Sequence, residues 1–385
     1  MSVLGLPRPA WMTDELDLLA DATRRFLETE ALPNYERWEK QQQIDRAFWK
    51  KAGDQGLLGA EVPEEFGGPG GSFAHDAVIT RQSGLAGTDG WGGPLHNAIV
   101  IPYILHYGTR EQKERLLPRL VAGDLVGAIA MTEPGAGSDV QSIRTRAEKA
   151  GNSYAISGSK TFITNGHTAD LILLAAKTDQ SLGAKGVSLF LVETQGLEGF
   201  RRGRNLDKIG LKANDTAELF FDNAKVPADA LLGEAEGQGF SQLMQQLPQE
   251  RLLIAIQATS RIERALKVTL DYVKERKAFG HPIAEFQNTQ FELAECKTEA
   301  TVAQVFVDHC IERHLRGELD TATASMAKYW TTDLQCKIID RCLQLHGGYG
   351  YMNEYPIAKM YRDARVERIY GGTNEIMKVL IARTL

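Results

Sequence analysis

The sequence predicts an α+β fold in which one β region separates two helical regions. Apolar side chains recur at helical spacing from residue 13 to about residue 125, and the same period returns in long segments after Gly239. Between residues 126 and 232, short apolar runs are bounded by Gly, Asn, Asp and Pro, which is typical of strands. Strands and helices do not alternate, so a doubly wound sheet is not expected. The predicted domains are residues 1–125 (helical), 126–235 (β) and 236–385 (helical).

Each region has its own markers of where elements begin and end. In the first, Leu16, Leu18 and Leu19 follow acidic residues at helix spacing, and glycines around Pro69 mark a loop. In the second, the apolar runs predict strands around residues 154–156, 171–176, 187–192 and 219–221. In the third, helices are expected over residues 242–277, 285–316, 321–347 and from residue 374 onward.

Composition restricts the class of protein. The chain has 385 residues, 43% hydrophobic and 24% charged, as in an ordinary globular protein. A net charge of -6 without a long basic run argues against a nucleic-acid partner. No stretch approaches the roughly 18 apolar residues of a membrane span, and no secretory signal precedes the first helix. The 4 cysteines form no C-x-x-C pair, which predicts no metal site and buried thiols in a reducing cytoplasm.

Residues 131–139 (MTEPGAGSD) form the most distinctive segment of the chain. They do not fit a dinucleotide-binding fingerprint, because a β region follows rather than a strand–helix–strand unit. Gly137 removes a side chain where a planar ring or a phosphate could lie against the backbone, and Thr132 and Ser138 offer hydroxyls nearby. Taken alone, the loop is better explained as a glycine-rich connection into the β region.

A second segment, residues 160–166 (KTFITNG), changes that interpretation. It has the pattern of a strand followed by Asn-Gly. Phe162 presents an aromatic face and Thr164 a hydroxyl on the same side, because side chains alternate along a strand. This pair suits one face and one edge of a flat heterocycle.

Together these segments resemble the acyl-CoA dehydrogenase family. Further matching stretches follow at residues 276–280 (RKAFG), 344–350 (QLHGGYG) and 369–376 (IYGGTNEI), so the motifs cover nearly the whole chain in the right order. The resemblance implies an N-terminal helical domain, a middle β-barrel-like domain and a C-terminal four-helix bundle. It also implies assembly as a homotetramer, a dimer of dimers, or as a dimer.

The resemblance implies FAD as the cofactor. The flavin would be held by the loop that ends at Ser138, which is also near the CoA arm, and by the second segment; the residues are Met131, Thr132, Gly137, Ser138, Phe162 and Thr164. A neighbouring subunit's FAD would be reached by Arg276, Phe279, Gln287, Gln344, Gly347 and Gly348, with Thr373 and Glu375 completing the site. A guanidinium such as that of Arg276 matches a pyrophosphate, although from the residue alone a solvated arginine at a helix end is favoured.

The chemistry implied by the resemblance removes a proton from the carbon next to a thioester and a hydride from the following carbon. A buried carboxylate is the natural base, because burial raises its pKa toward roughly 6–7. In many family members a Glu follows the Tyr of the last motif, but here Tyr370 is followed by Gly371. Either the protein is inactive or its base comes from elsewhere.

Glu250 is the candidate base. It precedes the apolar run at residues 252–256, where a helix is buried and an unpaired acid is costly. Pro248 cannot donate to the carbonyl of Met244, so the helix is expected to kink or open there. An ion pair with a neighbouring helix is the alternative role. The resemblance favours the base, because long-chain and isovaleryl-CoA dehydrogenases carry their Glu at this helix position.

Three further residues are assigned to the substrate. The resemblance places the backbone N–H of Gly371 near the thioester carbonyl, where such a donor contributes roughly 3–4 kcal/mol to stabilising an enolate. Tyr370 is assigned to substrate binding, and Arg251 either contacts CoA or forms a structural salt bridge. The missing side chain at Gly371 is expected to open space beside the reacting carbons.

The predicted function is therefore FAD-dependent conversion of an acyl-CoA to the trans-2-enoyl-CoA, with an electron-transferring flavoprotein as the acceptor, in the cytoplasm. Residues 247–255 and 327–330 most resemble the long-chain acyl-CoA dehydrogenases, which implies a long-chain acyl-CoA as substrate. A methyl-branched or terpenoid acyl-CoA of isovaleryl or citronellyl type is the alternative. Two other classes stay open: an acyl-CoA oxidase, and a non-catalytic acyl-CoA-binding relative.

Overall fold

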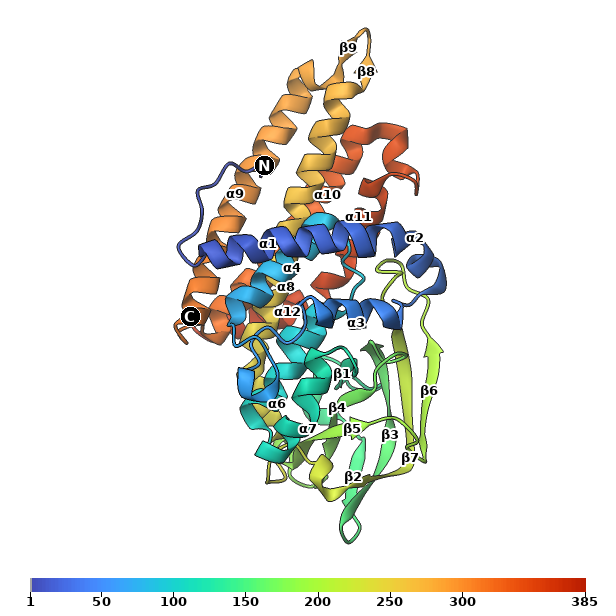
Figure 1. Ribbon diagram of the computed structural model, residues 1–385. Coiled ribbons are helices and arrows are strands. Elements are labelled where there is room, and N and C mark those ends of the chain that lie inside the picture. The colour runs from blue at the N-terminus through green and yellow to red at the C-terminus, as the bar shows by residue number, and fades with distance from the viewer. Residues whose placement is uncertain (1) are drawn as a thin grey trace.

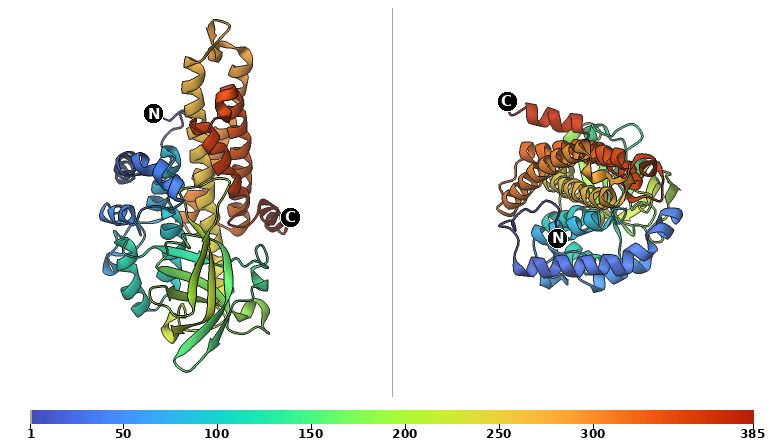
Figure 2. Two further views of the ribbon diagram at one scale, coloured as in Figure 1. Left: turned by 90° about the vertical axis from the view of Figure 1, so that its right-hand side faces the viewer. Right: turned by 90° about the horizontal axis from the view of Figure 1, so that it is seen from above.

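The computed structural model describes residues 2–385 and contains a helical, a β and a second helical part (Figure 1). The sheet lies at one end, and the N-terminal helices lie partly beside the sheet and partly beside the middle of the molecule. The long C-terminal helices extend past both and protrude at the other end, as the side view also shows (Figure 2). The order of helical, β and helical regions is that predicted from the sequence.

The N-terminal part is built from short helices with clear capping residues. Thr13, Ser72 and Thr109 accept backbone N–H groups at the starts of three of them, which satisfies donors that a helix leaves free. A π-helical turn, η3 (His96–Val100), separates α5 from α6. The helices are α1 (Asp14–Phe26), α2 (Leu32–Gln41), α3 (Arg46–Asp54), α4 (Phe73–Ala86), α5 (Gly93–Leu95), α6 (Ile101–Tyr107) and α7 (Arg110–Val121).

The middle part is a 7-stranded sheet in the order β1-β4-β2-β3-β7-β6, with β5 added beside β4. β1 pairs with β4 in parallel, with Gly127 opposite Leu171, whereas β3 and β7 pair in antiparallel fashion. β4 is buried along its whole length, so it forms the centre of the sheet's core. The strands are β1 (Gly127–Ala130), β2 (Arg146–Lys149), β3 (Ser153–Thr164), β4 (Leu171–Lys177), β5 (Val187–Glu193), β6 (Phe200–Asn205) and β7 (Thr216–Pro227).

The C-terminal part contains three long helices, and α11 packs against two of them, α8 and α10. The hairpin of β8 and β9 joins α8 to α9 at the protruding tip (Figure 1). The elements are α8 (Gly239–Glu275), β8 (Lys277–Ala278), β9 (His281–Pro282), α9 (Gln287–Leu315), α10 (Thr321–His346), α11 (Pro356–Ala364) and α12 (Asn374–Ala382). α8 has 37 residues and continues through Pro248, so the helix does not end before Glu250.

α8 is the element that connects all three parts. It packs against α4 and α6 of the N-terminal part, against β5 of the sheet, and against α9, α10 and α11. Most of its first half is buried, including residues 249–256. No helix within residues 2–385 is long and apolar enough to cross a membrane. The same part of the chain contains no group of three or more His, Cys, Asp or Glu side chains that could hold a metal ion.

Candidate active site

Glu250 lies in α8 where this helix passes α6, and only 4% of its surface is exposed. The Tyr103 hydroxyl donates a hydrogen bond of 2.8 Å to Glu250 Oε1. No Lys, Arg or His among residues 2–385 forms an ion pair with Glu250; of the two buried arginines of the same helix, Arg261 pairs with other acids and Arg251 forms no ion pair. The alternative role of Glu250 in an ion pair with a neighbouring helix therefore has no support.

The pKa of Glu250 suits a base that works near neutral pH. Burial raises this pKa to about 7, and the Tyr103 hydrogen bond and the charge of Arg251 lower it by less than burial raises it. A carboxyl group in this range is partly ionised at neutral pH and can still accept a proton readily. Glu250 therefore has the burial and the pKa that are expected of a general base.

The backbone before Tyr103 explains how α6 reaches α8. The π-helical turn η3 uses an i→i+5 hydrogen bond, so it adds a residue and rotates the face that α6 presents. Pro102 has no N–H to donate to the Ala98 carbonyl four residues earlier. Gln249 Nε2 donates to that carbonyl at 3.0 Å. α6 and the turn before it are therefore tied to two consecutive residues of α8, Gln249 and Glu250.

Gly371 faces the same stretch of α8. Its φ is +65°, and a Cβ at this position would come within 2.4 Å of Ile254 Cδ1. Ile254 is one helical turn after Glu250 and lies on the same face of α8. Gly371 and Glu250 therefore border one region. The expectation that the missing side chain opens space is wrong, because Ile254 occupies that space.

The loop that follows Gly371 is fixed by α10. Lys328 is fully buried, and its Nζ donates to the Gly372 carbonyl at 2.7 Å and to Asn374 Oδ1 at 2.9 Å. Asn374 Nδ2 in turn donates to Thr332 Oγ1 at 3.0 Å. Gly372 has a φ of +88°, so two consecutive residues adopt backbone conformations that glycine tolerates best. These bonds hold the N–H of Gly371 in a defined place.

A buried ionic network fixes the other side of this loop. Arg261 pairs with Asp89 at 3.0 Å and also with Glu367, and the Tyr370 hydroxyl donates to Glu367 Oε1 at 3.3 Å. Arg261 lies two helical turns after Ile254 on the same face of α8. One stripe of α8 therefore contacts Glu367 through Arg261 and Gly371 through Ile254. Glu250 is the next residue along that stripe.

Arg251 is buried without a charged partner. Only 4% of its surface is exposed, no acid of residues 2–385 forms an ion pair with it, and its Nε has no hydrogen-bond partner there. The alternative of a structural salt bridge for Arg251 is therefore unsupported. A buried guanidinium without a partner is costly unless a ligand supplies one.

The structure brings together the two segments predicted to hold the flavin. The Thr161 N–H donates to the Thr132 carbonyl at 3.0 Å. Lys160 is buried and donates to the Met131 carbonyl at 2.9 Å and to Glu133 Oε1 at 2.8 Å. Burial lowers the pKa of Lys160 to about 8, although the charge of Glu133 acts to raise it. The loop before Ser138 is thus anchored on β3 through a buried ion pair.

Both loops leave room for a flat ligand. A Cβ on Gly137 would meet nothing within 4 Å, and Ser138 beside it is exposed. Phe162 has a φ of +60° and is 68% exposed, at an irregularity in the pairing of β3 with β7. Thr164, two residues later, is half-buried. An exposed aromatic ring on strained backbone beside an open glycine loop fits the planar ring system of FAD.

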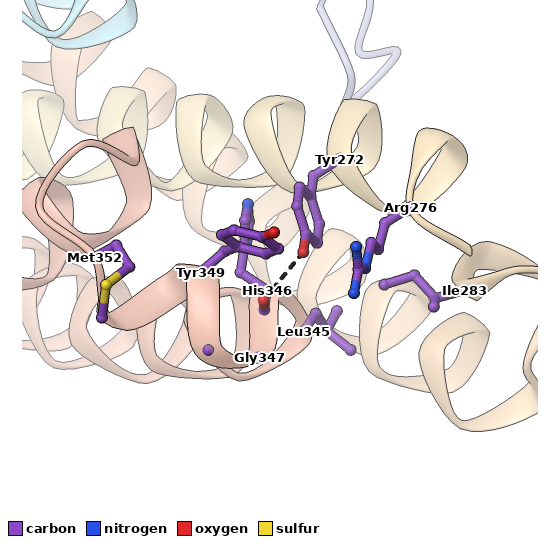
Figure 3. A pocket seen from close by; sticks show the side chains of 9 residues that line it. Tyr272, Arg276, Ile283, Leu345, His346, Gly347, Tyr349 and Met352 are labelled. Atoms are coloured by element: carbon purple, nitrogen blue, oxygen red, sulfur yellow. Dashed lines mark hydrogen bonds between the residues drawn. The ribbon is translucent and has the colours of Figure 1, made fainter. Parts of the chain in front are cut away.

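The residues predicted to reach a neighbouring subunit's FAD form a separate cluster near the tip of α8. Arg276, His346, Gly347 and Gly348 line a pocket of 530 Å³ (Figure 3). The Arg276 guanidinium lies 5.4 Å from the centre of the Tyr349 ring. A Cβ on Gly347 or Gly348 would meet nothing within 4 Å, so the backbone there is open to a ligand. A pyrophosphate fits such a pocket, because it would meet a guanidinium and bare backbone.

Within one chain this pocket is far from the other FAD residues. Arg276 follows Glu250 by 26 positions at the end of the same helix, which corresponds to about 39 Å along its axis. Phe279 lies in the β8–β9 hairpin and is 95% exposed, and Gln287 begins α9 and is also exposed. Gln344 is exposed next to the pocket. The β8–β9 hairpin lies at the opposite end of the molecule from the sheet (Figure 1), so the structure does not bring these residues to the loop before Ser138 in the same chain.

The last two predicted cofactor residues lie at the start of α12. Thr373 is its N-cap, and its Oγ1 accepts the Ile376 N–H at 3.4 Å. Glu375 is exposed in the first turn, where its own backbone N–H group lowers its pKa. Both residues follow directly after the glycine loop, so they lie at the edge of the region that Glu250 and Gly371 border.

Models of the acyl-CoA dehydrogenase family match all three parts of the chain. The N-terminal domain model matches residues 13–124, the middle domain model residues 128–224 and the C-terminal domain model residues 237–385. The chain therefore belongs to the acyl-CoA dehydrogenase family. It is an FAD-dependent oxidoreductase that dehydrogenates acyl-CoA.

Individual relatives agree with this assignment. The chain is 51% identical to the mitochondrial long-chain specific acyl-CoA dehydrogenase of Rattus norvegicus over 97% of this chain and 87% of that protein. It is 34% identical to the mitochondrial isovaleryl-CoA dehydrogenase of Solanum tuberosum, over 98% and 94% of the two chains. A crystal structure of an acyl-CoA dehydrogenase from Geobacillus kaustophilus superposes with a TM-score of 0.96 at 50% identity, covering 98% of this chain and 99% of that one.

Sequence patterns did not indicate some residues that shape the site. Tyr103 and Ile254 are apolar-face residues of ordinary helical periods, and no local pattern shows which partner they meet. Lys328 lies in a stretch that supported the resemblance, yet a lysine within a helix gives no sign of being fully buried. Lys160 precedes Phe162, and its burial could only be inferred from its place in a central strand.

Proposed function

We propose that the chain converts a long-chain acyl-CoA to the trans-2-enoyl-CoA, with Glu250 as the base. One observation carries the role of Glu250: it is a buried carboxyl group with a pKa raised to about 7, one helical turn from the residue that abuts Gly371. The rat relative, named for long-chain substrates, supports the acyl-chain class at 51% identity. The isovaleryl-CoA dehydrogenase of potato is more distant, at 34%.

In the proposed reaction, Glu250 removes a proton from C2 of the thioester. The electron pair of that C–H bond forms the C2=C3 double bond as a hydride leaves C3. Bound FAD supplies the acceptor for this hydride. The Gly371 N–H donates to the thioester oxygen, where negative charge develops. Arg251, Tyr370 and Ser138 are proposed to contact the CoA thioester. In support of this, Arg251 is a buried cation whose Nε has no protein partner among residues 2–385.

The FAD residues are proposed in two groups. Met131, Thr132, Gly137, Ser138, Phe162 and Thr164 would hold the flavin, and Thr373 and Glu375 would border it. Arg276, Phe279, Gln287, Gln344, Gly347 and Gly348 would hold the pyrophosphate and adenosine end of FAD bound to a neighbouring subunit. Their distance from Glu250 in one chain supports this division and hence an assembly of at least two subunits. We propose that this assembly is a homotetramer, a dimer of dimers. We further propose an electron-transferring flavoprotein as the acceptor, and a cytoplasmic location.

The acyl chain can be identified by flavin bleaching. Purified holoenzyme is mixed without oxygen with straight-chain acyl-CoAs from four to sixteen carbons and with isovaleryl-CoA and citronellyl-CoA. The proposal predicts the fastest bleaching with straight chains of twelve or more carbons. Faster bleaching by a branched thioester would assign the enzyme to the methyl-branched class. Peroxide formation at the rate of substrate oxidation under air would instead identify an oxidase.

A further inference from the structure

The Glu250 carboxylate is held on one side only. Tyr103 is fully buried, with 0% of its surface exposed, and its hydroxyl donates to Glu250 Oε1 at 2.8 Å. Within residues 2–385 no side chain or backbone group donates to Glu250 Oε2. One oxygen of the base is therefore anchored on α6, and the other is free to meet a substrate.

Such an arrangement has two physical consequences. A hydrogen bond to one carboxylate oxygen removes most of the rotational freedom of a glutamate side chain, so the free oxygen points in a defined direction. Burial and the charge of Glu250 keep the pKa of Tyr103 well above its ordinary value. The Tyr103 hydroxyl therefore keeps its proton and acts as the donor when Glu250 is ionised. The hydroxyl therefore favours the ionised form of the carboxyl group, against the effect of burial.

We infer that Tyr103 is a positioning residue for the base: its hydroxyl holds Glu250 Oε1, directs Oε2 toward C2 of the substrate and favours the ionised form of the Glu250 carboxyl group. This inference rests on the proposed role of Glu250 as the base. Tyr103 belongs to the hydrophobic core that α6 shares with the sheet, so its ring cannot move away without disturbing that core. The Gln249 bond to the Ala98 carbonyl also fixes η3, the turn that leads into α6, against α8.

Few other groups act on Glu250. Arg251 from α8 is the charged neighbour that lowers its pKa. Lys328 of α10 lies close enough to Arg251 for the charge of Arg251 to lower the pKa of Lys328. Tyr107, one turn after Tyr103 on α6, offers a matched control. Its hydroxyl donates to Gln245 Oε1 at 2.9 Å and does not contact Glu250. Removal of either hydroxyl makes the same chemical change on the same helix.

The experiment compares Tyr103→Phe, Tyr107→Phe and Glu250→Gln with the unmodified holoenzyme. The dependence of kcat/KM on pH is measured from pH 5 to pH 9 with a straight-chain acyl-CoA. Deprotonation of a 3-thia-acyl-CoA, which has an acidic C2 but no C–H at position 3, is titrated separately by absorbance. FAD content and thermal unfolding are recorded for each variant.

We expect the acidic limb of the Tyr103→Phe profile to move up by about one to two pH units, because the ionised base loses a charge-assisted hydrogen bond. At pH 7 its kcat/KM should fall by about 5- to 50-fold, and most of this loss should disappear at pH 9. The 3-thia-acyl-CoA titration should move in the same direction. The Tyr107→Phe limb should stay in place.

Two outcomes would overturn the inference. If the acidic limb of the Tyr103→Phe profile stays at the same pH as in the unmodified enzyme, with or without a uniform loss of rate, Tyr103 is only a core residue. If Glu250→Gln also retained activity, the proposed base itself would be wrong. Should Tyr103→Phe fold poorly, site-specific replacement of Tyr103 by 3-fluorotyrosine gives the opposite prediction: a more acidic phenol donates more strongly, so the limb should move to lower pH. An unmoved limb would again contradict the inference.

Discussion

A Cβ on Gly371 would lie 2.4 Å from Ile254 Cδ1, so a side chain at residue 371 would overlap the isoleucine side chain. Many family members have a glutamate after the tyrosine of this motif, whereas here a glycine faces an isoleucine of α8. The carboxylate lies one helical turn away on the same face, as Glu250. The space that a side chain at residue 371 would occupy is thus filled from α8, and Gly371 gives no indication of a branched substrate.

Gly371→Ala should destabilise the protein by about 2–4 kcal/mol, from an unfavourable positive φ and from overlap with Ile254. Ile254→Val removes the Cδ1 atom itself. In the Gly371→Ala background this second change should recover about 1–3 kcal/mol, although alone it should cost about 0.5–1.5 kcal/mol. Urea unfolding of the four proteins gives the coupling energy. Additive effects would contradict the contact.

Moving the carboxylate to residue 371 should fail unless Ile254 is shortened as well. Glu250→Thr with Gly371→Glu should have no measurable turnover, because the new side chain overlaps Ile254. Adding Ile254→Val should restore some turnover if residues 250 and 371 face the same substrate carbon. If the double variant already turns over substrate and adding Ile254→Val gives no improvement, this geometry is contradicted.

Glu250 should make stability depend on pH. Its pKa is about 7 in the folded protein and near 4.5 when unfolded, so the neutral form is favoured by folding. The associated stability is fully present below about pH 4.5 and is lost as pH rises through 7, for a total of roughly 3 kcal/mol. The stability of Glu250→Gln relative to the unmodified protein should therefore increase between pH 5 and pH 8. Thermal unfolding at fixed FAD concentration measures this, and a constant difference would contradict the raised pKa.

Lys328→Met should impair catalysis more than cofactor binding. The change removes the hydrogen bonds from Lys328 to the Gly372 carbonyl and to Asn374 Oδ1, so the Gly371 N–H is held less firmly in place. A misplaced enolate-binding donor typically costs about 100-fold in rate. We expect a loss in kcat of this order with FAD retained. Lys337→Met, an exposed position on α10, is the control and should be unaffected.

Arg276→Ala should lower FAD retention although Arg276 lies about 39 Å from Glu250 along α8. The expected result is loss of FAD during gel filtration, with Lys274→Ala unchanged as an exposed control on the same helix. If the site is shared between subunits, mixed assemblies of Arg276→Ala and Glu250→Gln chains should regain part of the activity that each variant alone lacks. No recovery on mixing would contradict a shared site.

The sequence indicated the elements well because their signals are local. Periodicity placed α9 at residues 285–316 and the structure has it at Gln287–Leu315, and the segments before Ser138 and Phe162 do meet, through the Thr161–Thr132 hydrogen bond. Contacts between distant segments could not be predicted in this way. Tyr103 and Glu250 are 147 residues apart, and their meeting depends on a π-helical turn that no residue pattern announces. The filling of space at Gly371 by Ile254 likewise depends on how α8 passes the C-terminal loop.

The rate of flavin reduction in Glu250→Gln tests the central claim most directly. The variant is mixed without oxygen with a straight-chain acyl-CoA, and flavin absorbance is followed in a single turnover. A second buried glutamate of α8, Glu263, which pairs with Arg81 at 2.8 Å, provides the matched control as Glu263→Gln. We predict that Glu250→Gln binds FAD and substrate but reduces its flavin about 100- to 10,000-fold more slowly. Glu263→Gln should stay within tenfold of the unmodified rate. Flavin reduction by Glu250→Gln within tenfold of the unmodified rate would contradict the assignment of Glu250 as the base.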